Sequence, residues 1–281
     1  MLKQRIITAI VLLAILLPAV FYPAVAVFGL VAAVLIAAGA WEWSRLNHVS
    51  SFAALLSGGV CAALCMASWY FGLVGAMPSA IWILIGGGWV IFGAWLLWAG
   101  SAAWLKVPLL LRWCGGILAL WVAWLAVVQA RIIGINFLFS VLGLVWVADI
   151  GAYFAGRMFG GRFFARKLAP SISPGKTWEG VCGGVLGVLL CAFVWSALDA
   201  EGAATQVSLY TRLGSNGLAF MVLAVLFMTM MSVVGDLVES LFKRSAGVKD
   251  SSNLLPGHGG VLDRVDALLP ILPLAMVFVT L

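Results

Sequence analysis

Charge is the property that this sequence lacks most. Only 9% of its 281 residues are Asp, Glu, Lys or Arg, whereas 64% are hydrophobic. An average soluble domain carries about 25% charged residues, so this chain cannot cover a soluble surface of its size. The composition therefore excludes a soluble globular domain and predicts an all-α, polytopic membrane protein. The net charge of +6 is then attributed to basic residues on one side of the membrane rather than to nucleic-acid binding.

Cysteine is scarce as well, and its pattern excludes two further classes of site. The five cysteines lie in apolar runs, their number is odd, and none belongs to a Cys-x-x-Cys pair. They are therefore expected to be small buried residues, and not disulfides or zinc ligands.

Long apolar runs are what the chain has instead. A spanning helix needs about 20 largely apolar residues, and about nine transmembrane helices are predicted on this criterion. The segments are 6–22, 24–43, 52–73, 80–99, 113–130, 134–154, 180–197, 217–236 and 262–281. The first also resembles a signal peptide, with a cleavage-like Ala24-Val-Ala26. Because apolar sequence resumes at once and continues to Trp43, we expect an uncleaved first helix.

The basic residues support this number of helices. With nine spans and a cytoplasmic N-terminus, fourteen of the sixteen Lys and Arg residues face the cytoplasm, and only Arg131 and Arg212 lie outside. Such a bias is typical of membrane proteins. We therefore expect a multi-pass protein of the cell inner (plasma) membrane, with its N-terminus in the cytoplasm.

The polar residues divide the chain into two parts. Residues 1–112 carry few polar groups, so they are predicted to be scaffold helices that form a wall for lipid or the surface of a possible homodimer. Residues 113–281 are predicted to be catalytic, because two expected cytoplasmic loops, 155–179 and 237–261, hold most of the polar groups.

One stretch, from Ser240 to Asp266, is unusually polar for this chain. It contains four cations, three carboxylates and one of the two histidines. Cations bind phosphates, and the divalent metal that accompanies nucleotide phosphates prefers carboxylate oxygens. Gly257, Gly259 and Gly260 surround His258 and are expected to let the backbone approach a ligand closely. The stretch therefore predicts a site for a triphosphate and a second phosphate-bearing substrate.

The order of these residues resembles the signature of the CDP-diacylglycerol synthase family, the phosphatidate cytidylyltransferases. The matching residues are Ser240, Lys243, Arg244, Lys249, Asp250, Pro256, His258, Gly259, Gly260, Asp263, Arg264 and Asp266. The resemblance implies a membrane enzyme of phospholipid biosynthesis. It would transfer the cytidylyl group of CTP to phosphatidic acid, giving CDP-diacylglycerol and pyrophosphate, with Mg²⁺ as cofactor.

The other polar loop contains Gly175-Lys176-Thr177 before an expected helix. The residue five positions before Gly175 is Pro170 and no strand precedes it, so this is not a Walker motif. A lysine and a threonine at a helix N-terminus can nevertheless hold a phosphate. The segment from Ser173 to Gly180 is also similar to one in the same family, which usually has a second basic residue where this chain has Gly175; no role is assigned there.

Residues and resemblance together define the expected site. The expected catalytic residues are Lys243, Arg244, Lys249, Asp250, His258 and Arg264. The expected substrate-binding residues are Ser173, Lys176, Thr177, Ser240, Gly259 and Gly260. The expected metal ligands are Asp236 and Asp263, which match the family's metal-binding acidic positions, followed by Asp149 and Asp266.

Three of the carboxylates have alternative interpretations. Asp149 lies within an apolar segment, where an ionisable group indicates function, but it could also be an interfacial residue paired with Arg157. Asp263 could be the N-cap of the last helix. Asp236 could end the preceding helix, although a carboxylate is disfavoured at a helix C-terminus.

The basic groups also allow other interpretations. Arg162, Arg166 and Lys167 could simply set the topology. His258 could donate a hydrogen bond to phosphate or support its loop. A secondary transporter of an anionic substrate is the alternative function, but it predicts polar residues near the middle of broken helices. Here they gather at helix ends and loops, which favours the enzyme, with CTP, phosphatidic acid and the lipid bilayer as partners and no nucleic acid.

The charge bias generates a test of orientation. A Ser252→Cys variant in a cysteine-free background is expected to resist an impermeant thiol reagent added outside intact cells, because loop 237–261 is predicted to be cytoplasmic. Ready labelling of intact cells would reject this orientation.

Overall fold

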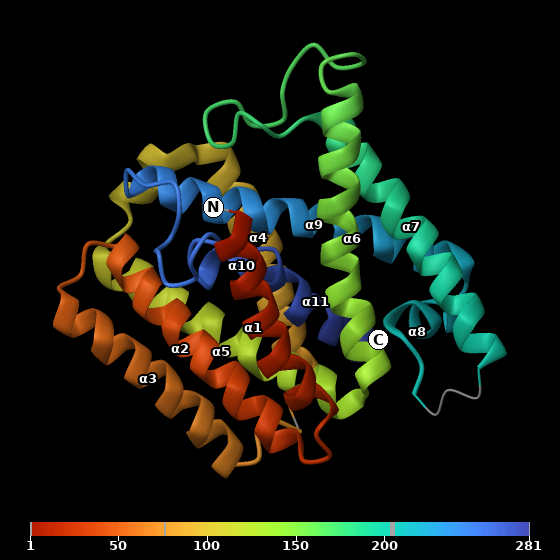
Figure 1. The fold of residues 1–281 in the computed structure, drawn as a ribbon, viewed down its shortest axis with the longest axis horizontal. Coiled ribbons are helices and arrows are strands. Elements are labelled where there is room, and N and C mark those ends of the chain that lie inside the picture. The colour runs from red at the N-terminus through yellow and green to blue at the C-terminus, as the bar shows by residue number, and fades with distance from the viewer. Residues whose placement is uncertain (1, 76, 203–205, 281) are drawn as a thin grey trace.

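The computed structural model describes residues 2–75, 77–202 and 206–280, which form helices joined by loops (Figure 1). The helices are α1 (Leu2–Phe21), α2 (Val25–Leu46), α3 (Ser51–Tyr70), α4 (Ser79–Lys106), α5 (Leu109–Ile133), α6 (Ile135–Phe159), α7 (Trp178–Glu201), α8 (Leu209–Ser215), α9 (Leu218–Ser245), α10 (Leu262–Val265) and α11 (Leu268–Thr280). Eight of them, α1 to α7 and α9, are long and apolar enough to cross a membrane. The predicted all-α, polytopic class is confirmed.

The ninth predicted span differs from the prediction. Segment 262–281 is broken after Val265, and its longer part, α11, has only 13 residues. A helix of that length measures about 20 Å, less than the roughly 30 Å hydrocarbon core. Phe278 near its end contacts Phe220 at the start of α9, so the segment still runs toward the end of the bundle opposite loop 246–261.

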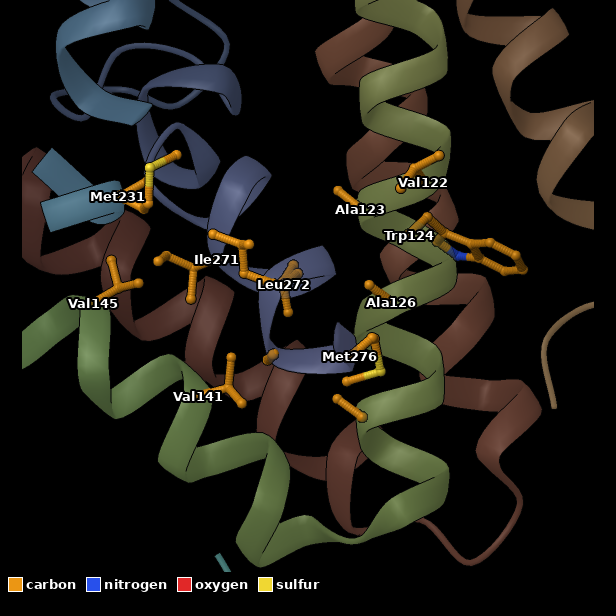
Figure 2. Close-up of a cluster of buried hydrophobic side chains, with 14 of the residues drawn as sticks. Val122, Ala123, Trp124, Ala126, Val141, Val145, Met231, Ile271, Leu272 and Met276 are labelled. Atoms are coloured by element: carbon orange, nitrogen blue, oxygen red, sulfur yellow. The ribbon is translucent and has the colours of Figure 1, made fainter. Parts of the chain in front are cut away.

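Helix α11 lies inside the bundle rather than at its surface. Figure 2 shows Ile271, Leu272 and Met276 of α11 between side chains of α5 and α6, among them Ala126 and Val141. All five of these residues are buried. The apolarity of segment 262–281 therefore reflects burial against protein as much as contact with lipid. Hydropathy alone does not separate these two environments.

Helices α6 and α7 are in close contact (Figure 1), and Gly180 and Gly184, four residues apart on α7, lie at this contact. A Cβ atom at Gly180 would lie 2.9 Å from the carbonyl oxygen of Ala152, and one at Gly184 would lie 2.8 Å from that of Ala148. No side chain fits at these positions without moving the backbone. The contact fixes the start of α7 against the end of α6, where the second polar loop begins.

Helix α9 is longer than predicted and changes the boundaries of the polar loop. The predicted span 217–236 continues to Ser245, so the prediction of a loop over 237–261 is wrong for its first nine residues. Asp236 therefore lies inside a helix and does not end one. Asp236, Ser240 and Lys243 follow at helical spacing on one face of α9.

The polar loops gather at one end of the bundle. Thr8 of α1 donates a hydrogen bond to the carbonyl of Pro256 at 2.9 Å. Arg244 of α9 donates to the carbonyl of Ile172, in the loop between α6 and α7, at 3.2 Å. Helices α1, α6, α7 and α9 therefore present both polar loops on the same side of the bundle.

The cysteine prediction is confirmed only in part. Cys61 and Cys65 are buried, whereas Cys114 and Cys182 are exposed on the outside of their helices.

The close α6–α7 contact can be tested at one glycine. Gly184→Ala is expected to lower the apparent thermal midpoint in detergent, because overpacking against a backbone carbonyl costs about 1–3 kcal/mol. Gly87→Ala on α4 is the matched control, since nothing lies within 4 Å of its added Cβ. Equal midpoints for the two variants would contradict the close contact.

Candidate active site

Helix α9 is joined by ion pairs to the loop before α7 and to α10. The Asp236 carboxylate pairs with Lys176 from the loop before α7. One to two turns later, Lys243 pairs with Glu239 on the same helix and with Asp263 of α10, the latter at 2.5 Å. The loop before α7 and helix α10 therefore both contact α9.

A cavity of about 420 Å³ opens where these groups meet. Its polar lining comes from α6, the start of α7 and α9, and comprises Asp149, Tyr153, Arg157, Lys176, Thr177 and Asp236. Thr177 is the N-cap of α7, and its hydroxyl accepts the Gly180 N–H at 3.1 Å. The N-terminus of a long helix beside Lys176 and Arg157 is a favourable place for a phosphate.

An apolar cavity of about 400 Å³ lies on another face of α9. Aromatic side chains of α2, α4 and α9 line it, among them Trp43, Trp104 and Phe242. Its charged lining residues are Arg112 and Glu239. Helix α9 thus borders one cavity suited to phosphates and another suited to hydrocarbon.

Asp263 organises the loop that precedes it. Its carboxylate accepts the backbone N–H groups of Ser251 at 2.9 Å and Gly260 at 2.8 Å, and the Ser251 hydroxyl at 2.8 Å. Burial alone would raise the pKa of Asp263, but Lys243 and these N–H groups hold the pKa below its usual range. The N-cap interpretation is wrong, because α10 begins at Leu262 and Asp263 lies inside its first turn.

The glycines of this loop make room for protein carboxylates. Gly259 has a φ of +80°, and a Cβ there would lie 2.6 Å from the Asp263 carboxylate. A Cβ at Gly260 would lie 2.3 Å from the carboxylate of Glu42. Both glycines let the backbone approach side chains of this chain closely, and close approach to a ligand at these positions stays a prediction.

Glu42, on α2, is the residue that the sequence analysis missed. It is fully buried and accepts hydrogen bonds from the Ser251 and Ser252 hydroxyls and from the N–H groups of Val261 and Leu262. A carboxylate inside the apolar segment 24–43 is the signal that could have identified it. Because Ser252 is engaged here, the exposed neighbour Asn253 is the better position for the labelling experiment.

Two of the expected phosphate-binding cations, Arg244 and Arg264, hydrogen-bond to loop carbonyls, whereas a third, Lys249, is exposed. Arg244 donates to the carbonyls of Ile172 and Val248, both at 3.2 Å, and Arg264 donates twice to the carbonyl of His258. Both guanidinium groups thus fasten loops. Lys249 and Asp250 are exposed, and among the described residues neither side chain forms an ion pair or hydrogen bond.

The remaining expected residues have simpler surroundings. The Nδ1 atom of His258 is buried without a hydrogen-bond partner among the described residues, and its backbone carbonyl supports the loop through Arg264. Ser240 lies 3.4 Å from Asp236. Ser173 forms a backbone hydrogen bond to Ala169, within the loop that carries Lys176.

Two of the expected metal ligands, Asp149 and Asp236, line the same cavity. The charges of Asp149, Asp236 and Asp266 interact, and burial together with Asp236 raises the pKa of Asp266 to about 7. Within residues 2–75, 77–202 and 206–280, no group of three or more His, Cys, Asp or Glu side chains is close enough to form a metal site by itself. Mg²⁺ commonly takes only one or two carboxylates beside phosphate oxygens, so this donor set fits it.

Asp263 fits the metal less well than the other three carboxylates. Both of its oxygens are already engaged, one by Lys243 and the other by the loop. Asp149 lines the cavity. In the part of the chain that the structure describes, Arg157 donates a hydrogen bond to Tyr153 and forms no ion pair with Asp149. The interfacial ion pair considered for Asp149 is therefore not formed.

The fold and the site define a class: a polytopic membrane protein with a cavity of cations and carboxylates at one end of its helix bundle. The chain belongs to the cytidylyltransferase family, whose model matches residues 3–281. It is 38% identical to the phosphatidate cytidylyltransferase of Pseudomonas aeruginosa over 284 residues, which cover 97% of this chain and 95% of that protein. Phosphatidate cytidylyltransferases of Haemophilus influenzae and Brucella suis are 47% and 46% identical over about half of this chain. The resemblance inferred from the sequence is confirmed, and no comparison supports a transporter.

The two loop contacts of Arg244 generate a prediction. Arg244→Lys is expected to lower kcat/KM at least about tenfold, because one ammonium does not replace a guanidinium that reaches two carbonyls. Arg162→Lys is the matched control, since Arg162 is exposed and no side-chain hydrogen bond depends on it among the described residues. Wild-type turnover of Arg244→Lys, with normal insertion, would show that this cation only sets topology.

Proposed function

We propose that this protein transfers the cytidylyl group of CTP to phosphatidic acid, giving CDP-diacylglycerol and pyrophosphate. The observation that carries the proposal is the similarity to a phosphatidate cytidylyltransferase over nearly the whole length of both chains. The cavity between α6, α7 and α9 supports it, because cations, carboxylates and a helix N-terminus meet there at one end of a membrane bundle. A protein that joins a nucleotide to a membrane lipid needs this combination.

In the proposed reaction a phosphate oxygen of phosphatidate attacks the α-phosphorus of CTP. The bond between that phosphorus and the oxygen bridging to the β-phosphate breaks, and pyrophosphate leaves with the electron pair. A phosphate nucleophile is already ionised, so no general base is required. The protein therefore catalyses the transfer by positioning the two substrates and by neutralising the charge of their phosphates. Lys176 and the start of α7 are placed to hold phosphate, and the apolar cavity on the other face of α9 offers a place for acyl chains.

The proposed cofactor is Mg²⁺, held by Asp236 and Asp266 with Asp149 beside them. When bound, it would neutralise phosphate oxygens during the transfer. The mutual repulsion of these carboxylates supports a cation at this place. Asp263 keeps the role of loop anchor in this proposal.

The proposed location is the inner (plasma) membrane, with the N-terminus and both polar loops in the cytoplasm, where CTP is available. The charge bias of the sequence supports this orientation. A homodimer through residues 1–112 remains a prediction, as does the division of the chain at residue 112.

The function is tested with purified protein in detergent, supplied with CTP, phosphatidate and Mg²⁺. Wild-type protein is expected to form CDP-diacylglycerol, and Asp236→Asn is expected to form less than about 1% as much, because it removes a negative charge from the proposed metal site. The measurement is product formation across a Mg²⁺ titration.

A matched control separates a metal role from a general charge effect. Glu201→Gln removes a carboxylate at the opposite end of α7, where it is exposed, and is expected to leave activity unchanged. Substantial activity of Asp236→Asn at saturating Mg²⁺ would remove that residue from the proposed ligands, and inactive wild-type protein would remove the proposed function.

A further inference from the structure

The residues proposed to bind substrate come from α6 to α10, but the loop between α9 and α10 depends on a side chain from the opposite end of the chain. Glu42, on α2, has no exposed surface. It lies 209 to 220 positions before the four groups that donate to it. No cation pairs with it among the described residues, so hydrogen bonds alone satisfy this buried charge.

The two oxygens of Glu42 divide the loop between them. Oε1 accepts the Ser252 hydroxyl at 2.6 Å and the Val261 N–H at 3.0 Å. Oε2 accepts the Leu262 N–H at 2.8 Å and lies 3.2 Å from the Ser251 hydroxyl. Both ends of the segment between Ser251 and Leu262 are thereby held at one carboxylate.

Ser251 connects this carboxylate to the next one. Its hydroxyl lies 2.8 Å from the Asp263 carboxylate as well as 3.2 Å from that of Glu42. Asp263 in turn holds Lys243 of α9. A continuous path of hydrogen bonds and ion pairs therefore leads from α2 through the loop to the face of α9 that carries Asp236.

We propose that Glu42 is a positioning residue for the cytidylyl transfer. It fixes the ends of the loop between α9 and α10, so that Asp263, Lys243 and the exposed residues Lys249 and Asp250 are held in place. The inference rests on the proposed function for its kinetic part. Its structural part, that Glu42 orders this loop, does not depend on the reaction.

The chemistry of the carboxylate explains why the obvious isostere fails. A glutamine has one acceptor oxygen, and its NH₂ group can only donate. Val261 and Leu262 present N–H groups to different oxygens of Glu42, so Glu42→Gln places two donors face to face at one of them. A buried N–H group without an acceptor is costly, and the loop is expected to move away from α2.

The test compares Glu42→Gln with Ser44→Ala in the full chain. Ser44 lies half a turn away on the same helix, is equally buried, and accepts a hydrogen bond from Trp113 instead of from the loop. Glu42→Gln is expected to lower kcat at least about tenfold with a smaller change in the KM for CTP. It should also accelerate tryptic cleavage after Lys249 several-fold, at a thermal midpoint close to that of Ser44→Ala. Glu42→Asp, which keeps all acceptor sites, should restore part of the turnover.

The outcomes separate the inference from the proposed function. Wild-type kcat and unchanged cleavage at Lys249 in Glu42→Gln would overturn the inference. So would an equal loss of activity in Ser44→Ala, which would indicate general destabilisation of α2. Should Glu42→Gln fail to insert, Ser252→Ala replaces it in the test, because it removes a single donor to Glu42. It is expected to lower kcat and to accelerate cleavage after Lys249 in the same direction, but by smaller factors. Wild-type protein that forms no CDP-diacylglycerol would overturn the proposed function, while the cleavage measurement would still test the loop.

Discussion

A carboxylate inside an apolar helix bundle must be satisfied by hydrogen bonds or by a cation. This constraint shapes the end of the bundle where the polar loops gather. Desolvating an unpaired charge costs far more than a domain's net stability can absorb. Glu42 meets the requirement with hydroxyl and backbone donors, and Glu239 meets it through Lys243. The positions of these carboxylates therefore dictate where the loop backbone runs and which lysines turn inward.

The same constraint divides the acidic residues into two kinds. Asp263 and Glu42 accept hydrogen bonds from the loop between α9 and α10, and both thereby hold that loop. Among the described residues, Asp236 pairs with Lys176, Asp149 lines the same cavity, and Asp266 accepts the Ala267 N–H at 2.7 Å. Their arrangement is left with negative charge that a ligand can use. Glu42 and Asp263 thus hold the loop, whereas Asp149 and Asp236 line a cavity that a ligand can enter.

Much of the fold and part of the site could be predicted from the sequence, because both depend on local signals. Apolar length identified eight spans, and the spacing of Gly180 and Gly184 indicates a close helix contact, although not that its partner is α6. The end of α9 was placed nine residues too early, because hydropathy falls at Asp236 whereas helical hydrogen bonding continues to Ser245. The roles of Arg244, Gly260 and Glu42 depend on contacts between distant segments, which spacing along the chain does not encode. The charged motif predicted that both polar loops lie on one side of the bundle, but not which of its charged groups hydrogen-bond to the loops themselves.

The pairing of α2 with the last loop has a consequence for how the protein is made. Glu42 is synthesised more than 200 residues before the Val261 and Leu262 N–H groups that satisfy it. During translation this carboxylate lacks its final donors and must be hydrated or bound to other groups until six further spanning helices have been synthesised. The loop between α9 and α10 can therefore be held at Glu42 only in a chain whose synthesis has reached α10.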